Sequence, residues 1–223
     1  MKLTVAMITM NEEGAVAKVV GDIRSVAPDA EILLVDSSRD RTAEIAEELG
    51  CRVIKQFPPQ GYGPAMDRAV REGSGDIVIT LDCDDTYPVD AIPKLVSMVE
   101  NEGYDLVNTT RVARRPKAMP FANFLANRFF ALGARVIHGL KTTDVHSGMR
   151  AYRKSMIEQI RWNPKGPALP VDMIVIPHRL GFRIAEFPID YRERIGTTTL
   201  QRFSSTLWTF RRLWNARSVP KRK

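Results

Sequence analysis

Cysteine and histidine are scarce in this chain, which has two cysteines and three histidines among 223 residues. Cys51 and Cys83 form neither a disulfide framework nor a metal-binding spacing, so we expect two reduced thiols. His138, His146 and His178 lie far apart and do not suggest a shared metal. We expect solvent-exposed or core histidines, and only His146 lies in a loop with other candidate residues.

Long apolar segments and glycine-rich phosphate loops are also missing. No uncharged stretch approaches the roughly 18 apolar residues of a membrane-spanning helix, so no such helix is expected. The N-terminus, MKLTVAMITMNEE, lacks the cleavage site of a secretory signal and is interpreted as a first strand. Neither G-x-x-x-x-G-K-[ST] nor G-x-G-x-x-G occurs. A nucleotide diphosphate would therefore need another positive partner, such as a divalent cation held by carboxylates.

Acidic residues are rare in the second half of the chain. Residues 1–105 contain 10 Lys and Arg and 20 Asp and Glu, whereas residues 106–223 contain 23 and 6. Residues 201–223 contain seven basic residues and no acidic residue. The formal net charge of +7 thus combines an acidic first part with a basic second part. This split indicates a cation site in the first part and phosphate or an anionic surface near the second.

Strand and helix signals alternate through the first hundred residues. Runs rich in Val, Ile and Leu predict strands, and the segments between them predict helices. The alternation predicts an α/β protein with a mainly parallel sheet covered by helices. The predicted strands are 3–8, 31–36, 51–54, 76–81 and 106–110, and the predicted helices are 15–25, 42–49, 64–72, 90–100 and 121–140. Residues 142–154 are expected to form a polar loop, and residues 167–194 a helix followed by a strand.

The strand predicted at 76–81 leads into three carboxylates, in the stretch VITLDCDDTYP. Asp82, Asp84 and Asp85 would repel one another unless a cation or several hydrogen-bond donors lay between them. In open parallel sheets, ligands bind at the carboxyl ends of the strands, where the loops TMNEE and DSSRDRT should also lie. We therefore expect a composite site in which Asp82 and Asp84 hold a hard cation, Mg²⁺ or Mn²⁺.

Several stretches together match one enzyme family in order and spacing. MITMNEEGAV, LLVDSSRDRTAEIA, GYGPAMDRAVREGSGDIVITLDCDDTYP and DVHSGMRAYRK resemble the family 2 glycosyltransferases with the GT-A fold. FRIAEFPIDYRERIGTTTLQRF resembles more narrowly the dolichyl-phosphate mannose synthases and related polyprenyl-phosphate glycosyltransferases. The resemblance covers about residues 3–203. It implies a GT-A domain over residues 1–200, with a nucleotide-sugar half (1–105), an acceptor half (106–200) and a basic amphipathic tail (201–223).

The resemblance implies roles for residues on the donor side. Thr9, Glu12 and Asp36 would contact the nucleotide sugar, with Glu12 and Asp36 against the nucleoside. Asp82 and Asp84 would be the family's Asp-x-Asp pair, which holds the metal and the sugar nucleotide. The donor would be GDP-mannose or a UDP-hexose, and the sequence does not choose between them.

On the acceptor side, the resemblance places Arg111, Ser147, Arg150 and Arg194 around a polyprenyl (dolichyl) phosphate. Arg111 and Arg194 would join the two aspartates as catalytic residues. The implied reaction is an inverting hexosyl transfer. A phosphate acceptor with a second pKa near 6 is already mostly ionised and needs no general base. Asp172 is the one acid that could serve as a base, and a helix N-cap is the alternative.

The tail, LQRFSSTLWTFRRLWNARSVPKRK, predicts an amphipathic helix. Leu200, Phe203, Leu207, Phe210 and Trp214 would form one apolar stripe. Such a basic helix could lie in a membrane interface, and residues 200–223 are expected to attach the protein peripherally to the cytoplasmic face of a membrane. The alternative is a helix packed on its own domain or on a second subunit. A membrane-protein partner or a homodimer is also compatible with the sequence.

Three other functions stay open from the sequence. A family 2 transferase could act on a soluble sugar or a small acid, with the tail serving oligomerisation. A nucleotidyltransferase also uses paired acids on a metal, but the Gly- and Lys-containing signature expected near its N-terminus is not seen. A nucleic-acid-binding module could use the basic C-terminus, but no nucleic-acid partner is expected.

Overall fold

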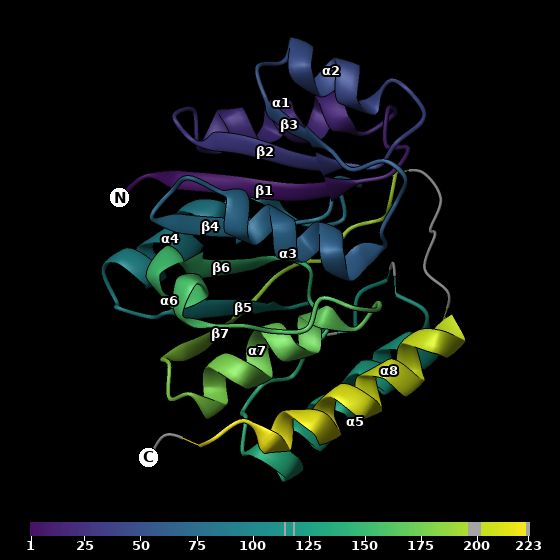
Figure 1. Cartoon of the computed structure of the whole chain (residues 1–223). Helices are drawn as coiled ribbons and strands as arrows, with labels where there is room; N and C mark the ends of the chain where they lie inside the picture. The colour runs from purple at the N-terminus through teal and green to yellow at the C-terminus, as the bar shows by residue number, and fades with distance from the viewer. Residues whose placement is uncertain (114, 118, 196–201, 222–223) are drawn as a thin grey trace.

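A single seven-stranded sheet organises the molecule, a computed structural model that describes residues 1–113, 115–117, 119–195 and 202–221, without the side chains of 202–205 (Figure 1). The order of the strands across the sheet is β3-β2-β1-β4-β6-β5-β7. The strands are β1 (Leu3–Thr9), β2 (Glu31–Asp36), β3 (Arg52–Lys55), β4 (Ile77–Thr80), β5 (Leu106–Thr110), β6 (Arg150–Arg153) and β7 (Ile184–Pro188).

Six of these strands run in one direction, and β6 runs against its neighbours β4 and β5. The strands β2, β4 and β5 are almost continuously buried, as their Val, Ile and Leu content predicts for a sheet covered on both faces. Thr9 pairs with Asp36 at the ends of β1 and β2. The carboxyl ends of the parallel strands therefore meet at one edge of the sheet.

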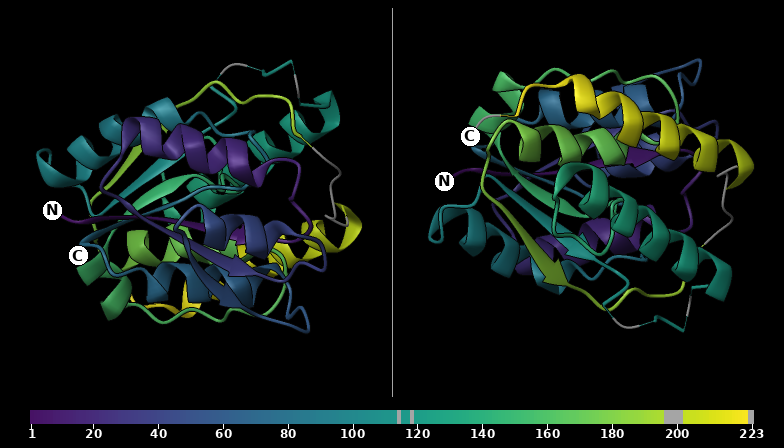
Figure 2. Two further views of the ribbon diagram at one scale, coloured as in Figure 1. Left: turned by 90° about the horizontal axis from the view of Figure 1, so that it is seen from above. Right: turned by 90° about the horizontal axis from the view of Figure 1, so that it is seen from below.

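Helices cover both faces of the sheet and complete the predicted α/β architecture (Figure 2). A core cluster on one face includes α1 (Val16–Val26), α2 (Thr42–Glu48) and α4 (Ile92–Glu100). The cluster on the other face includes α3 (Tyr62–Glu72), α5 (Phe121–His138), α6 (Lys154–Gln159), α7 (Leu169–Arg179) and α8 (Arg202–Asn215). Short 3₁₀ turns occupy Val89–Ala91 and Ala216–Ser218.

The polar segment 142–154, predicted as a loop, contains strand β6. Its sequence RAYR lacks an apolar run, so the strand has no signal in hydrophobic periodicity. It forms because Ala151 and Tyr152 are buried and because Arg150 finds internal partners for its guanidinium. Helix α6 was also not predicted, whereas the helix followed by a strand expected within 167–194 is confirmed as α7 and β7.

Helix α8 packs on α5 and α7 mainly through residues outside the predicted apolar stripe, although Phe210 of the stripe contacts Phe129 and Phe130 of α5. Thr209, Leu213 and Ala216 are buried, whereas Leu207 and Trp214 are 73% and 64% exposed. His138 of α5 also bonds to the carbonyl of Leu213, with 2.8 Å between Nε2 and O. Of the other stripe positions, Leu200 and the side chain of Phe203 lie outside the described part of the chain. The helix is thus held on its own domain mainly by a different face.

A buried ion pair fixes α8 to α7. Arg212 donates to the carboxylate of Asp172, and both residues are nearly inaccessible, at 5% and 8% exposure. Asp172 lies inside α7, whose N-cap is Ala168, so the alternative reading of Asp172 as an N-cap is wrong. Burial raises the pKa of Asp172 to about 6, and Arg212 opposes that rise.

None of the helices in the described part of the chain combines the length and the apolar character needed to cross a bilayer.

The substitution Arg212→Met should lower the free energy of unfolding by roughly 3–5 kcal/mol, because it leaves the Asp172 carboxylate buried without a counter-charge. Urea titration followed by circular dichroism measures the loss. Since Arg212 opposes the rise, its removal should raise the pKa of the buried Asp172 carboxyl above the wild-type value of about 6. The loss should therefore be largest at alkaline pH and should shrink as the pH falls toward 6. The double variant Asp172→Asn/Arg212→Met is the control and should recover part of the stability. An Arg212→Met protein as stable as wild type would contradict this role of the pair.

Candidate active site

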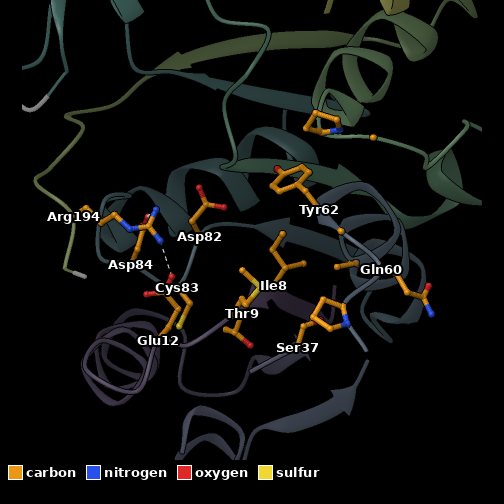
Figure 3. A pocket seen from close by; sticks show the side chains of 16 residues that line it. Ile8, Thr9, Glu12, Ser37, Gln60, Tyr62, Asp82, Cys83, Asp84 and Arg194 are labelled. Carbon is orange, nitrogen blue, oxygen red and sulfur yellow. Dashed lines mark hydrogen bonds and ion pairs between the residues drawn. The ribbon is translucent and has the colours of Figure 1, made fainter. Parts of the chain in front are cut away.

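A cavity of about 440 Å³ opens at the carboxyl edge of the sheet (Figure 3). Loops after three neighbouring strands contribute to its wall. Thr9 ends β1, Ser37 follows β2, and Asp82 and Asp84 follow β4. Tyr62, at the start of α3, lines the same cavity. The composite site predicted from the ends of the strands is therefore present as one concave space.

Thr9 and Asp36 form a buried pair at one side of this cavity. The Thr9 hydroxyl donates to Asp36 Oδ1 over 2.6 Å, and Ser38 Oγ donates to the same oxygen over 2.6 Å. Thr9 lines the cavity, but Asp36 lies behind it, 4% exposed. Asp36 thus orients the Thr9 hydroxyl at the cavity wall, and Ser37 is among the lining residues that the sequence analysis did not single out.

Three carboxylates converge on the opposite side, and Arg194 bridges two of them. Arg194 Nη2 lies 2.6 Å from Glu12 Oε1, and Nη1 lies 3.0 Å from Asp84 Oδ2. Asp84 is also fixed by the amide and hydroxyl of Thr86, at 3.1 and 2.5 Å. Figure 3 shows Asp82 beside this group, directed into the cavity. Four predicted site residues are therefore brought together from β1, β4 and the segment after β7.

The position of Arg194 follows from the backbone of the segment after β7. The amide of Arg192 donates to the carbonyl of Thr86, and the amide of Ile195 donates to the carbonyl of Asp84, at 2.9 and 3.0 Å. The segment thus runs along the acidic turn. A residue about 110 positions away in sequence is held against Asp84 by main-chain hydrogen bonds.

The acidic group carries more negative charge than its described partners neutralise. Burial, and then the neighbouring Asp84, raises the pKa of Asp82 to about 7. Burial likewise raises the pKa of Glu12, although Arg194 opposes the shift. A carboxyl group with such a raised pKa binds a cation more readily than a proton when a hard metal is available, because the metal cancels the repulsion.

Asp82 and Asp84 fit a divalent cation shared with a diphosphate. Among the described residues there is no group of three or more His, Cys, Asp or Glu side chains with the geometry of a complete metal site. Mg²⁺ does not require one, because it is commonly bound by one or two carboxylates together with substrate phosphates and water. The oxygen-only donor set also matches Mg²⁺ or Mn²⁺.

A second cavity, of about 420 Å³, meets the first at the acidic group. Tyr62, Asp82, Asp84 and Arg194 line both cavities. From this polar end, the second cavity extends between α5, α7 and α8, where much of its lining is apolar: Met119, Pro120, Ala126, Phe130, Pro167, Ala168 and Pro170. It therefore joins a charged end to an apolar end.

Arg111 lies in the wall of the second cavity with its guanidinium plane fixed. Asp144 accepts from Nε and Nη2 over 2.7 and 3.0 Å, and the guanidinium carbon lies 5.4 Å from the centre of the Tyr191 ring. Although burial opposes ionisation of Asp144, Arg111 and the His146 amide hold the pKa of its carboxyl below the usual value. Asp144, which the sequence analysis missed, is thus a positioning partner of Arg111.

Ser147 and Arg150 lie behind the second cavity and do not line it. The Ser147 hydroxyl lies 2.7 Å from that of Thr109. Arg150 is 1% exposed and donates to Asn108 Oδ1 and to the carbonyls of Val145 and Pro170. These hydrogen bonds hold the loop before β6 in place. Ser147 and Arg150 therefore support the wall of the second cavity from behind, and neither is exposed to a ligand inside it.

His146 and Gly148 are two further residues of that loop in the cavity wall. Burial lowers the pKa of His146 to about 4, so the ring is neutral, and its Nε2 lies 2.9 Å from Thr209 Oγ1 of α8. A side chain on Gly148 would start 3.0 Å from an oxygen of Asp82. The glycine therefore leaves the space into which Asp82 projects.

Comparison with known proteins is consistent with this site. The model of the family described as glycosyl transferase family 2 matches residues 4–161. A dolichyl-phosphate hexose transferase of Haloferax volcanii is 42% identical over 203 residues, covering 91% of this chain and 88% of the relative. A dolichol-phosphate mannosyltransferase of Pyrococcus furiosus is 30% identical over 188 residues, covering 78% of this chain and 53% of the relative.

Among solved structures, glucosyl-3-phosphoglycerate synthase from Mycobacterium tuberculosis, in complex with Mn²⁺, UDP and glucosyl-3-phosphoglycerate, superposes with a TM-score of 0.78. The alignment covers 98% of this chain and 81% of that one at 23% identity, and it confirms the predicted GT-A fold. With the family model matching well over half of its length, the chain belongs to glycosyltransferase family 2.

Proposed function

We propose that this protein transfers a hexose from a nucleotide sugar to a polyprenyl phosphate, assisted by Mg²⁺ or Mn²⁺ at Asp82 and Asp84. The observation that carries the proposal is the meeting of two cavities at one acidic group. A transferase needs two adjoining substrate sites, and the shared wall at Asp82, Asp84 and Arg194 is where the transferred group would pass. The names of the two relatives at 42% and 30% identity support a dolichyl-phosphate acceptor.

The first cavity would take the nucleotide sugar. Thr9 and Ser37 line it away from the acidic group, and Glu12 lines it within that group. These residues would contact the nucleoside, with Asp36 orienting the Thr9 hydroxyl. The metal would be held by Asp82 and Asp84 and would supply positive charge to the departing diphosphate. UDP in the structural neighbour favours a uridine donor, and the mannosyltransferase names among the relatives favour GDP-mannose.

The second cavity would take the acceptor. A phosphate at its charged end would lie near Arg111 and Arg194, and the isoprenoid would follow the apolar lining between α5 and α7. The phosphate oxygen attacks the anomeric carbon on the face opposite the diphosphate, the bond from that carbon to the diphosphate breaks, and the diphosphate leaves with the electron pair. The configuration is inverted. No general base is needed, because the acceptor phosphate is already ionised, and Asp172 lies outside both linings.

Removing the metal-holding carboxylate should abolish donor binding. Asp84→Asn should lower affinity for the matching nucleotide sugar by about 100-fold or more in the presence of Mn²⁺, because the diphosphate loses its counter-charge. Calorimetry with GDP-mannose, UDP-glucose and UDP-N-acetylglucosamine, each with Mn²⁺, Mg²⁺ or chelator, measures the affinity for the donor and identifies the nucleobase that the donor carries.

The matched control is Asp85→Asn. Asp85 is the neighbouring acid, pairs with Lys18 at 2.9 Å and lines neither cavity, and its backbone φ of 62° is one that asparagine also adopts. It should bind donor as wild type does. A folded wild-type protein that binds none of these donors under any metal condition would refute the proposal.

Replacing Arg111 should affect the acceptor and not the donor. Arg111→Lys keeps the charge but loses the planar pairing with Asp144, so we expect KM for polyprenyl phosphate to rise about tenfold while donor affinity is unchanged. Radiolabelled sugar transfer at varied acceptor concentration measures the change. An equal loss of donor affinity would contradict the role of Arg111 in binding the acceptor alone.

The same assay should compare polyprenyl phosphate with small phosphorylated acids, such as the phosphoglyceric acid bound by a structural neighbour. Efficient transfer to the soluble acid and none to the lipid would replace the proposed acceptor with a soluble one.

A further inference from the structure

Among the side chains that the structure describes, helices α5 and α8 expose eight large apolar ones. Their exposed fractions run from 47% for Phe210 to 76% for Val136. On α8, the packing against the domain is made mainly by a different set, which includes Thr209 and Leu213. Of the exposed residues on α8, Leu207 and Trp214 are 73% and 64% exposed, whereas Phe210 also contacts Phe129 and Phe130 of α5. The exposed residues are Phe121, Leu125, Phe129, Leu132 and Val136 of α5, and Leu207, Phe210 and Trp214 of α8.

These side chains form one continuous surface, which we name the α5–α8 surface. The ring of Phe210 lies 6.0 Å from that of Phe129 and 5.2 Å from that of Phe130, centre to centre. A Cβ on Gly133 would lie 3.4 Å from Leu213, which shows how closely the two helices approach. Figure 2, seen from below, shows α5 and α8 together on the same side of the molecule.

The charged side chains that the two helices themselves carry are all basic. Residues 106–143 and 201–223, which include both helices, contain no Asp or Glu. Exposed basic residues flank the apolar stripes: Arg128 and Arg135 on α5, Arg211 on α8, and Arg217 and Lys221 after it. The Arg217 guanidinium lies 4.2 Å from the centre of the Trp214 ring. An apolar stripe with Trp and Phe, edged by arginines, is the composition of helices that lie in the interface of an anionic membrane.

The second cavity lies between the same two helices. Asn123, Ala126 and Asn127 of α5 and Thr206 and Thr209 of α8 line it. A substrate that enters between α5 and α8 would therefore approach from the side of the molecule that carries the apolar stripes.

We propose that the α5–α8 surface lies in the interface of a membrane containing anionic lipids, with both helices contributing and not the tail alone. A second copy of the chain is a poorer occupant, because a two-fold contact would press one basic rim against another of the same sign. This membrane contact extends the proposed function, because it would place the entrance of the acceptor cavity at the lipid. It rests on that function only for the identity of the acceptor.

Vesicle co-sedimentation tests the surface without any enzymatic readout. Wild type should bind vesicles of phosphatidylcholine mixed with phosphatidylglycerol, and bind phosphatidylcholine alone much more weakly. Leu132→Gln/Val136→Gln on α5 and Leu207→Gln/Trp214→Gln on α8 should each weaken binding by about tenfold. The control, Leu49→Gln/Phe57→Gln, changes two exposed apolar residues elsewhere, 42% and 58% exposed, and should bind as wild type. Donor calorimetry should be the same for all four proteins, which verifies that each is folded.

Four results would overturn the inference. They are equal binding to neutral and anionic vesicles, loss of binding in the α8 variant alone, no vesicle binding by wild type, and a dimer in analytical ultracentrifugation that the α5 variant dissociates. The surface and the proposed function can fail separately. Vesicle binding without transfer to polyprenyl phosphate would leave the surface and refute the acceptor, whereas transfer to a detergent-solubilised acceptor without vesicle binding would do the reverse.

Discussion

The repulsion among Glu12, Asp82 and Asp84 is the constraint on which the rest of the site depends. Three carboxylates at one edge of a sheet are stable only with positive charge among them, and Arg194 supplies it through two contacts of 2.6 and 3.0 Å. To bring this arginine there, the segment after β7 must run along the turn after β4, held by main-chain hydrogen bonds. Both cavities share the resulting cluster, so one electrostatic requirement joins the first strand, the fourth strand and the last segment of the domain.

Much of the donor side could be predicted because it follows parallel strands. A strand rich in Ile and Val, followed at once by Asp82 and Asp84, identifies both the sheet and the edge where a ligand binds. The roles of Arg150 and Asp172 could not be predicted in the same way. A buried arginine and a buried aspartate look like ligand contacts in a sequence, and only their partners, Asn108 and Arg212, show that they hold the fold together. Such partners are distant in sequence and leave no local pattern.

The tail shows a second limit of sequence patterns. The described part of its predicted apolar stripe, Leu207, Phe210 and Trp214, is exposed, but hydrophobic periodicity gives no information about whether a stripe faces the protein or the outside. In the structure, Thr209, Leu213 and the Arg212 pair make contacts with α5 and α7, while Leu207 and Trp214 are exposed. A helix can thus be fixed to a domain while most of its described large apolar side chains remain exposed. The exposed stripe of α5 was not predicted, because the sequence analysis gave this helix only as residues 121–140.

The reversed direction of β6 separates the linings of the two cavities along the chain. Because β6 is antiparallel, its beginning lies at the edge where the other strands end, and the loop before it reaches the second cavity through His146 and Gly148. The residues that line only the first cavity come mainly from the loops after β1, β2 and β3. Substitutions that alter the lining of one cavity alone therefore fall in different loops from those that alter the other alone, and the two linings can change independently around the shared acidic centre.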